Sequence, residues 1–403
     1  MNPTAFAEYD FPSRRSVVMA RHGMVATSQV LAAQAGLQVL REGGNAVDAA
    51  VATAAVLAVV EPASTGPGGD AFALIWQQEE GRLYGLNASG GAPARLTADL
   101  LRAQGWDVVP RDGPLSVTVP AGVQGWAEAV GRFGRLGLDR VLSPAIRYAE
   151  EGFPVTEQIA AAWAAPGDKL RRYSGPGCAY LPGGRGPLAG EVFRNPDLAR
   201  TLRSIADRGP EGFYLGEVAA HICRVVQEAG GVLSPADMAA CSVEWVEPLA
   251  VPYRGHLLYE LPPNGQGLVA LLALGMAQHF PLRQMGHNTA AYVHHLAEAI
   301  KEGFREAVRH VAYPRFYRAP LPELLSPAYL GARAAAVDPF RASVLREKLP
   351  GSGTVYLTVV DEERNAVSFI NSIFAGFGSG IVVPGTGVVL QNRGACFTLE
   401  EGH

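Results

Sequence analysis

Residues 351–373 read GSGTVYLTVVDEERNAVSFINSI, and this stretch governs our interpretation of the whole chain. Two runs rich in β-branched and aromatic residues, 354–360 and 366–373, flank the polar segment 361–365, which is typical of a turn. The pattern predicts an antiparallel hairpin whose first residue is Thr354. Residues 338–353 before it are polar and have no clear period, so we expect a linker there.

Thr354 alone carries little information, because threonine is an ordinary strand residue. Its context changes the interpretation, since it opens a strand directly after a glycine, Gly353, at the end of a polar linker. Attack of the Thr354 hydroxyl on the unshielded Gly353 carbonyl would cut the chain and leave Thr354 with a free α-amino group. Such an amine has a pKa of about 7.7–8.0, so one residue can supply both nucleophile and base. This chemistry needs no histidine, metal or cofactor, and we expect neither a metal nor a cofactor.

The rest of the chain alternates helical and strand patterns. We expect a helix over 28–42 with Ser28 as its N-cap, and a second over 46–60 capped by Asn45. The second is apolar on nearly every face, which indicates complete burial. A long amphipathic helix is predicted over 289–310. This mixture predicts an α/β or α+β layered fold.

Other motifs have simpler explanations. The glycine-rich segment 376–380 is followed by an apolar run and Pro384, which suits a turn into a strand better than a dinucleotide site. The loop 64–70 suits either an anion cradle or a plain turn. His294 and His295 are adjacent on a helix and do not share a face, so a metal site is not expected.

Composition sets broad limits on function. The 403 residues carry a net charge of −4 with a pI near 6.2, which gives no indication of a nucleic-acid or anionic-membrane partner. The N-terminus lacks a signal-peptide pattern and the most apolar stretch, 49–60, is too short to span a membrane, so we expect a cytoplasmic protein.

The four cysteines form no CxxC pair. Two disulfides are compatible with their number, but isolated buried thiols fit a chain of this length better. The cysteines are Cys178, Cys223, Cys241 and Cys396.

Several long blocks together resemble the γ-glutamyltransferases, also called glutathione hydrolases. They are VATSQVLAAQAGLQVLREGGNAVDAAVATAAVLAVVEPASTGPGGDAF (25–72), YRG (253–255) with LPPNGQG (261–267), TVYLTVVD (354–361), NAV (365–367) and FGSGIVVPGTG (377–387). The resemblance runs from about Val25 to Phe397.

The resemblance implies an N-terminal-nucleophile fold, a four-layer αββα sandwich. It also implies a proenzyme cut between Gly353 and Thr354 into a large subunit (1–353) and a small one (from 354). The two would remain one structural domain and act as a heterodimer on a small-molecule amide. Thr354 would form an acyl-enzyme that water or an amine resolves. Ser372 lies where the family places a second hydroxyl that hydrogen-bonds the nucleophile.

The substrate positions depart from the family pattern. Ser89 stands where γ-glutamyl-binding members carry an arginine for the α-carboxylate, and a hydroxyl does not replace a bidentate guanidinium. Phe374 and Cys396 match an asparagine and an aspartate that hold the amino-acid head group. Arg393 matches a glutamine and offers another route to a carboxylate.

The family also continues well past Phe397, into paired serines and a Gly-Gly pair that supplies the oxyanion hole. Oxyanion donors of this kind supply roughly 2.7–4 kcal/mol of transition-state stabilisation. From the resemblance we therefore expect 354–403 to be an incomplete small subunit and the chain to be a piece of a longer gene product.

Three hypotheses remain open at this stage. The first is a Thr354-dependent γ-glutamyl hydrolase or transferase. The second is an acylase of the same chemistry that acts on another amide, such as a carboxylated acyl amide. The third is an uncut, catalytically silent fold that only binds.

Overall fold

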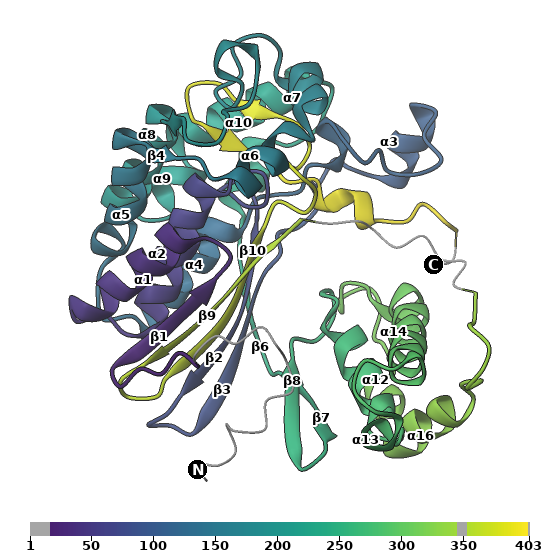
Figure 1. Ribbon diagram of the computed structural model, residues 1–403. Coiled ribbons are helices and arrows are strands. Elements are labelled where there is room, and N and C mark those ends of the chain that lie inside the picture. The colour runs from purple at the N-terminus through teal and green to yellow at the C-terminus, as the bar shows by residue number, and fades with distance from the viewer. Residues whose placement is uncertain (1–16, 345–352, 402–403) are drawn as a thin grey trace.

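The computed structural model describes residues 17–344 and 353–401. Its centre is a sheet of six strands in which every neighbouring pair is antiparallel (Figure 1). In spatial order the strands are β1 (Gly23–Thr27), β9 (Val355–Asp361), β10 (Ala366–Ser372), β2 (Asp70–Gln77), β3 (Arg82–Ala88) and β6 (Glu244–Val246).

The predicted hairpin is confirmed as β9 and β10, and it occupies the middle of the sheet. Strand β9 pairs with β1 on one side, and β10 pairs with β2 on the other. Strands that precede Gly353 in sequence therefore flank the two that follow it. Thr354 lies directly before β9, at the end of this central pair.

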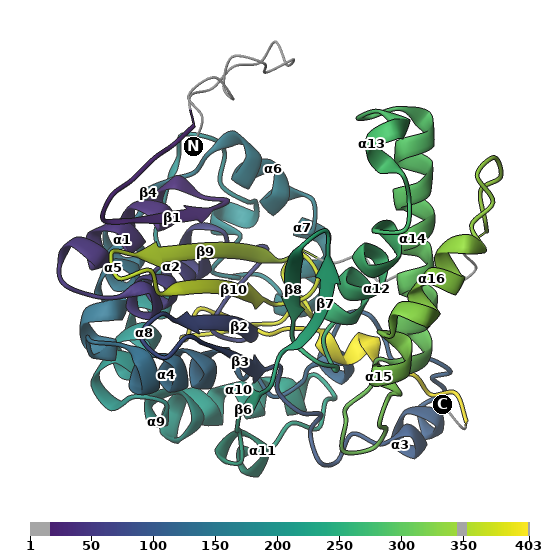
Figure 2. The same cartoon turned by 90° about the horizontal axis from the view of Figure 1, so that it is seen from below.

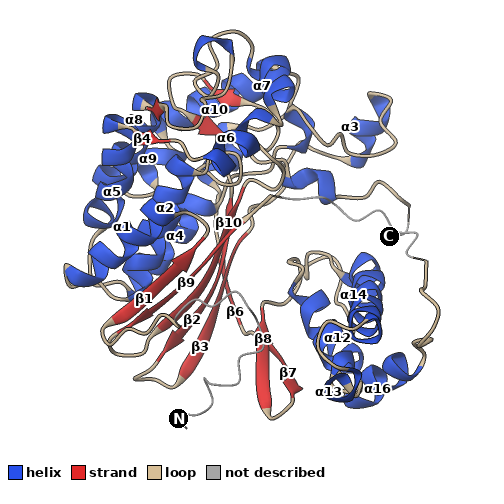
Figure 3. Ribbon diagram, in the orientation of Figure 1, coloured by secondary structure: helices blue, strands red, loops and turns tan. Residues whose placement is uncertain are grey.

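Helices cover one face of the sheet (Figures 1 and 3). Alternate residues of β9 point toward these helices and are buried, as the period of a half-covered strand requires. The helices that pack on this side are α1 (Val30–Arg41), α2 (Ala46–Val60), α4 (Gly122–Phe133), α5 (Leu138–Glu151) and α8 (Pro196–Arg208).

The predicted helix starts have different outcomes. Asn45 caps α2 as expected, and Asp48 completes a capping box with it; every residue of α2 is buried. The Ser28 cap is wrong, because the side chain of Gln29 accepts the hydrogen bond from the Leu31 N–H. Ser28 instead donates to Glu61 at 2.6 Å, a partner that local sequence does not reveal.

Further elements lie outside the sheet and these five helices. They are α3 (Ala98–Ala103), β4 (Phe153–Pro154), α6 (Glu157–Ala164), α7 (Gly167–Ser174), β5 (Val192–Phe193), α9 (Glu211–Tyr214), α10 (Gly216–Glu228), α11 (Pro235–Ala239), β11 (Val382–Val383) and β12 (Val388–Val389). Three 3₁₀ turns, 114–116, 182–184 and 393–396, complete this part.

A second unit with its own hydrophobic core lies across the sheet from α1 and α2 (Figures 1 and 2). It contains a hairpin and a group of helices, including the long helix predicted over 289–310. Its elements are β7 (Leu249–Tyr253), β8 (His256–Glu260), α12 (Gly267–Ala277), α13 (Leu282–Met285), α14 (Ala290–His310), α15 (Leu321–Leu324) and α16 (Pro327–Ala335).

The first part of the expected linker, 338–344, lies against α14. The Ser343 N–H donates to both carboxylate oxygens of Glu298, at 3.3 and 3.2 Å, and its hydroxyl also bonds to that carboxylate. Lys301 Nζ donates to the Ser343 carbonyl at 2.9 Å. The linker is therefore anchored at Ser343, and its remainder, 345–352, lies outside the described residues.

Two expectations from composition can be compared with the described residues. No helix in 17–344 or 353–401 is long and apolar enough to cross a membrane. The four cysteines are free thiols, as expected, but only Cys178 and Cys223 are buried, while Cys396 is exposed.

The first prediction concerns Asp361, which joins the β9–β10 turn to α2. Its buried carboxylate accepts hydrogen bonds from the Ala46 N–H at 3.0 Å and from the Asn365 N–H at 2.9 Å. Asp361→Ala leaves these buried donors without a partner, and we expect the free energy of unfolding to fall by about 2–3 kcal/mol. Urea unfolding measures this loss when Asp361→Ala is introduced into Thr354→Ala protein, which we expect to stay in one piece.

Glu362→Ala is the matched control. Glu362 is in the same turn but pairs with His22 on the surface, so this change should cost less than about 1 kcal/mol. Equal losses in the two variants would contradict the assigned role of Asp361.

Candidate active site

Four polar residues form a row across one end of the central sheet. Register pairs Ser372 of β10 with Asp70 of β2, and the pair Asn371–Val355 places Thr354 opposite Ser372. The pair Ala71–Ala88 places Ser89 next to Asp70 in the same way. Directly opposite residues in antiparallel strands point to the same face, so the four side chains share one face of the sheet.

The Ser372 hydroxyl is the centre of the hydrogen bonding at Thr354. It lies 3.0 Å from Thr354 Oγ1 and 3.3 Å from the Gly353 carbonyl oxygen, and it accepts the Phe374 N–H at 2.9 Å. A hydroxyl has one hydrogen to donate and two lone pairs. All three are used if Thr354 donates to Ser372 and Ser372 donates to Gly353. Ser372 is fully buried, whereas Thr354 is exposed.

Phe374 holds this arrangement through an unusual backbone conformation. Its φ is +74°, a left-handed value that is an outlier for a bulky residue. In this conformation the Phe374 N–H reaches Ser372, and the Phe374 carbonyl accepts the Gly353 N–H at 2.7 Å. Strain of this kind persists only where the surroundings impose it, and it is concentrated at functional sites.

The glycine-rich loop 64–70 packs beneath this end of the sheet. A side chain at Gly69 would place its Cβ 2.0 Å from the Ser372 carbonyl oxygen, and one at Gly68 would approach the Val389 carbonyl to 2.1 Å. The glycines therefore allow a close backbone approach, which favours the plain turn over an anion cradle.

Asp70 is a fully buried carboxylate paired with an arginine. Arg393 Nε and Nη2 lie 2.7 and 2.6 Å from Asp70 Oδ2, and the guanidinium stacks on the Phe374 ring at 4.8 Å. Asp70 Oδ1 is buried without a hydrogen-bond partner. Burial raises the pKa of the Asp70 carboxyl above its ordinary value, and Arg393 opposes this rise.

Cys396 joins the same group. Its surface is exposed, yet protein surrounds part of the sulfur, and this desolvation raises the pKa of the thiol against the opposing effect of Arg393. The structure thus brings together three of the four expected substrate positions, Phe374, Arg393 and Cys396.

Ser89 has different partners. Its hydroxyl accepts a hydrogen bond from Asn264 Nδ2 at 2.9 Å, and Asn264 Oδ1 accepts one from Asn87 at 2.8 Å. This small amide network joins the end of β3 to the loop before α12.

Sequence reasoning did not identify Asp70 or Asn264 as site residues. Asp70 had one available signal, because it is a charged residue directly before an apolar run, 71–76. Asn264 lies inside the quoted block 261–267, but only folding brings it to Ser89.

The remaining sequence motifs contribute to the fold and lie outside the row of Thr354, Ser372, Asp70 and Ser89. The segment 376–380 turns into β11, as predicted. His294 and His295 each hydrogen-bond a backbone carbonyl, of Asp338 at 2.7 Å and of Ala291 at 2.8 Å. Among the residues that the structure describes, no group of three or more His, Cys, Asp or Glu side chains is placed to hold a metal ion.

The second prediction tests the buried pair. Arg393→Met removes the only group that lowers the pKa of Asp70, so burial alone then acts on it. A carboxyl whose folded pKa is raised stabilises the fold below its unfolded pKa, and this contribution is lost as the pH rises through the folded pKa. We expect the variant to lose about 3–5 kcal/mol at neutral pH and less in acid.

Urea unfolding at about pH 4.5 and about pH 7.5 measures this difference. The double variant Asp70→Asn/Arg393→Met has no buried carboxylate and should lose the extra pH dependence. A pH profile of Arg393→Met that matches wild type would contradict the account.

Comparison with known proteins agrees with this geometry. The profile of the family described as Gamma-glutamyltranspeptidase matches residues 32–403. The Glutathione hydrolase-like YwrD proenzyme of Bacillus subtilis is 37% identical over 382 residues, which are 94% of this chain and 72% of the relative. The Oxamate amidohydrolase proenzyme of Klebsiella pneumoniae is 38% identical over 389 residues, 95% of this chain and 72% of that protein.

A solved structure gives the same result. The crystal structure of cephalosporin acylase from Bacillus halodurans superposes with a TM-score of 0.88 at 45% identity, and the match covers 98% of this chain and 74% of that one. The expected N-terminal-nucleophile fold is therefore confirmed. The chain belongs to the γ-glutamyltranspeptidase family of N-terminal-nucleophile hydrolases and acyltransferases.

Proposed function

We propose that the protein cuts itself between Gly353 and Thr354 and then uses Thr354 to hydrolyse or transfer the acyl group of an amide. One observation carries the proposal: a single buried hydroxyl, that of Ser372, lies within hydrogen-bond reach of both the Thr354 oxygen and the Gly353 carbonyl. The proposed nucleophile and the bond that it would attack therefore share one polar contact.

In the cutting step, Thr354 Oγ1 attacks the Gly353 carbonyl carbon. The Ser372 hydroxyl accepts a hydrogen bond from the Thr354 hydroxyl and donates one to the Gly353 carbonyl oxygen, which polarises that carbonyl. The Phe374 N–H donates to the Ser372 oxygen and fixes its position. The C–N bond breaks, the nitrogen takes the proton, and an ester joins Gly353 to Thr354 Oγ1. Water hydrolyses the ester, which leaves a carboxylate on Gly353 and a free amine on Thr354.

The two products would remain one structural domain, with 1–353 as the large subunit and the region from 354 belonging to the small one. Strand β9 pairs with β1 over five residues, and β10 pairs with β2 over seven. Separation would expose both rows of backbone hydrogen-bonding groups and the core beneath them.

In the acyl-transfer step, the free α-amino group of Thr354 takes the hydroxyl proton as Oγ1 attacks the substrate carbonyl. The same amine then gives that proton to the departing amine, and an ester on Thr354 remains. Water or a second amine resolves it. Ser372 stays hydrogen-bonded to Oγ1 throughout.

Arg393 is the residue that we assign to the acyl side of the substrate. Its Nε and Nη2 contact Asp70 and its face stacks on Phe374, so the guanidinium is fixed before any ligand arrives. Its side chain is 27% exposed, so it is open in part to a ligand. A fixed guanidinium edge suits a carboxylate, since less entropy is lost on binding. We therefore propose an amide whose acyl group carries a carboxylate.

A γ-glutamyl group is the second candidate, because a relative is named a glutathione hydrolase-like protein. Such a group also carries an α-ammonium. Within this cluster the carboxylate of Asp70 is already paired with Arg393, and Ser89, Phe374 and Cys396 bring no charge of their own at neutral pH. These side chains offer no unpaired carboxylate for an ammonium, so they favour an acyl group without one. Oxamate, which is named for another relative, is an amide of that kind.

The cytoplasmic location expected above stays part of this proposal. Cell fractionation with an antibody against the protein is the direct measurement.

The third prediction concerns self-cleavage and uses intact mass spectrometry. We expect wild type to give two fragments split after Gly353, and Thr354→Ala to stay whole. Ser372→Ala should fold and cut about a hundredfold more slowly, because the hydroxyl between nucleophile and carbonyl is gone. A whole wild-type chain contradicts the proposal and favours a fold that only binds, whereas normal cutting of Thr354→Ala would show that Thr354 is not the nucleophile.

The fourth prediction concerns the acyl group and uses three p-nitroanilides of equal carbon-chain length: glutaryl, γ-glutamyl and valeryl. We expect wild type to prefer the glutaryl amide, and Arg393→Gln to lower its kcat/KM about tenfold or more. The valeryl amide has no carboxylate and controls for general damage to the site. A parallel loss on glutaryl and valeryl amides would show that Arg393 acts only through the fold.

A further inference from the structure

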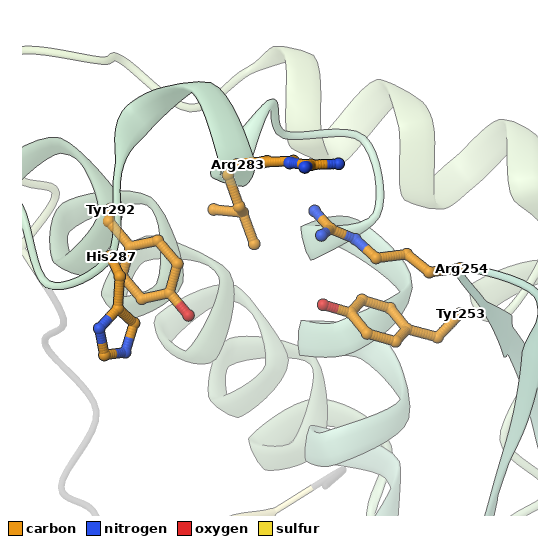
Figure 4. A pocket seen from close by; sticks show the side chains of 6 residues that line it. Tyr253, Arg254, Arg283, His287 and Tyr292 are labelled. Carbon is orange, nitrogen blue, oxygen red and sulfur yellow. The ribbon is translucent and has the colours of Figure 1, made fainter. Parts of the chain in front are cut away.

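A cationic pocket lies in the second unit and belongs to neither step proposed above. It has a volume of about 270 Å³ and is formed where the tip of the β7–β8 hairpin meets α13 and the first turn of α14 (Figure 4). Its lining residues are Tyr253, Arg254, Leu282, Arg283, His287 and Tyr292. Two arginines, a histidine and two phenol hydroxyls thus surround one small space with no acidic side chain among them.

The polar groups converge on the space. In Figure 4 the hydroxyls of Tyr253 and Tyr292 point toward each other across the pocket, and the guanidinium groups of Arg254 and Arg283 lie together along one side. Helix α14 begins at Ala290, so its N-terminal end, which carries partial positive charge, lies beside Tyr292. Among the lining groups and this helix end, every fixed charge is therefore positive or partly positive.

The two arginines lack an internal counter-charge. Across the described parts of the chain, neither forms an ion pair with a carboxylate, whereas thirteen other arginines there do. The contact of Arg254 with protein oxygen is a long one, from Nη2 to the Phe280 carbonyl at 3.5 Å. Two guanidinium groups held close together repel each other unless an anion lies between them.

The backbone supplies an independent argument. Arg254 and Gly255 are the two loop residues of the hairpin, with φ values of +49° and +84°. Positive φ at both positions is what a type I′ turn requires, and Asn, Asp or Gly is preferred at the first of them. An arginine there is conformationally unfavourable, and its side chain reaches the pocket. Strain of this kind indicates a role for the side chain rather than for the turn.

We propose that this pocket binds a small organic phosphate. A phosphate monoester carries a charge of about −1.5 to −2 near neutral pH and three acceptor oxygens, which match two guanidinium groups and the tyrosine hydroxyls. A carboxylate carries one charge and therefore balances the charge of only one of the two arginines. The volume lies just below the range of pockets for drug-sized ligands, and the two tyrosine rings provide flat walls for a small organic group.

Isothermal titration calorimetry at constant ionic strength tests the proposal with two matched probes. Phenyl phosphate and benzoate share a ring and differ in the anionic group. We expect wild type to bind phenyl phosphate at least about tenfold more tightly than benzoate, and Arg283→Gln to weaken phenyl phosphate about tenfold or more. Arg208→Gln, which removes an exposed arginine from the end of α8, is the control and should bind like wild type.

Arg254→Asn separates lost binding from lost folding. Asparagine is preferred at this turn position, so the thermal midpoint should stay the same or rise while phenyl phosphate binding falls. Binding by Arg283→Gln and Arg254→Asn that equals wild type overturns the proposal. So does an equal affinity of wild type for benzoate and phenyl phosphate, or the absence of any heat from either probe.

Discussion

The backbone pairing of β9 and β10 between β1 and β2 is the constraint on which the rest of the structure depends. It places a strand start, Thr354, at the end of the sheet and opposite Ser372, where register alone brings two hydroxyls to 3.0 Å. Because central strands have partners on both sides, the position of Thr354 is fixed by hydrogen bonds in two directions. In a strand at the edge of the sheet, the first residue would be held by hydrogen bonds to a neighbouring strand on one side only.

The same end of the sheet concentrates unfavourable features. Phe374 adopts a left-handed backbone conformation. The Asp70 carboxylate is fully buried, and its Oδ1 has no hydrogen-bond partner. These features are coupled, since Arg393 neutralises Asp70 and stacks on Phe374, while Phe374 holds both Ser372 and Gly353. The buried charge of Asp70 and the geometry at Thr354 are therefore parts of one network. Such local costs are tolerated where they serve a site and the surrounding core supports them.

Helix α14 connects two other features of the molecule. Its first turn carries Tyr292 of the cationic pocket. Further along, Glu298 and Lys301 hold Ser343, which precedes Gly353 by ten positions in the sequence. The second unit therefore holds the chain at Ser343, in the segment that precedes Gly353.

The sequence by itself determined the central hairpin, the capped start of α2 and the place of Thr354 directly before β9. The hairpin followed from two β-prone runs around a polar turn, and the Asn45 cap of α2 followed from side chains that bond to their own backbone neighbours. These are local effects, so a linear pattern carries them. The Ser28 cap failed because a distant Glu61 competed for its hydroxyl. The tertiary structure alone decided the Asp70–Arg393 pair, the Ser89–Asn264 contact and the convergence of Arg254 with Arg283. Each joins segments that are distant or differently oriented along the chain, and only packing of the layers brings such side chains within reach.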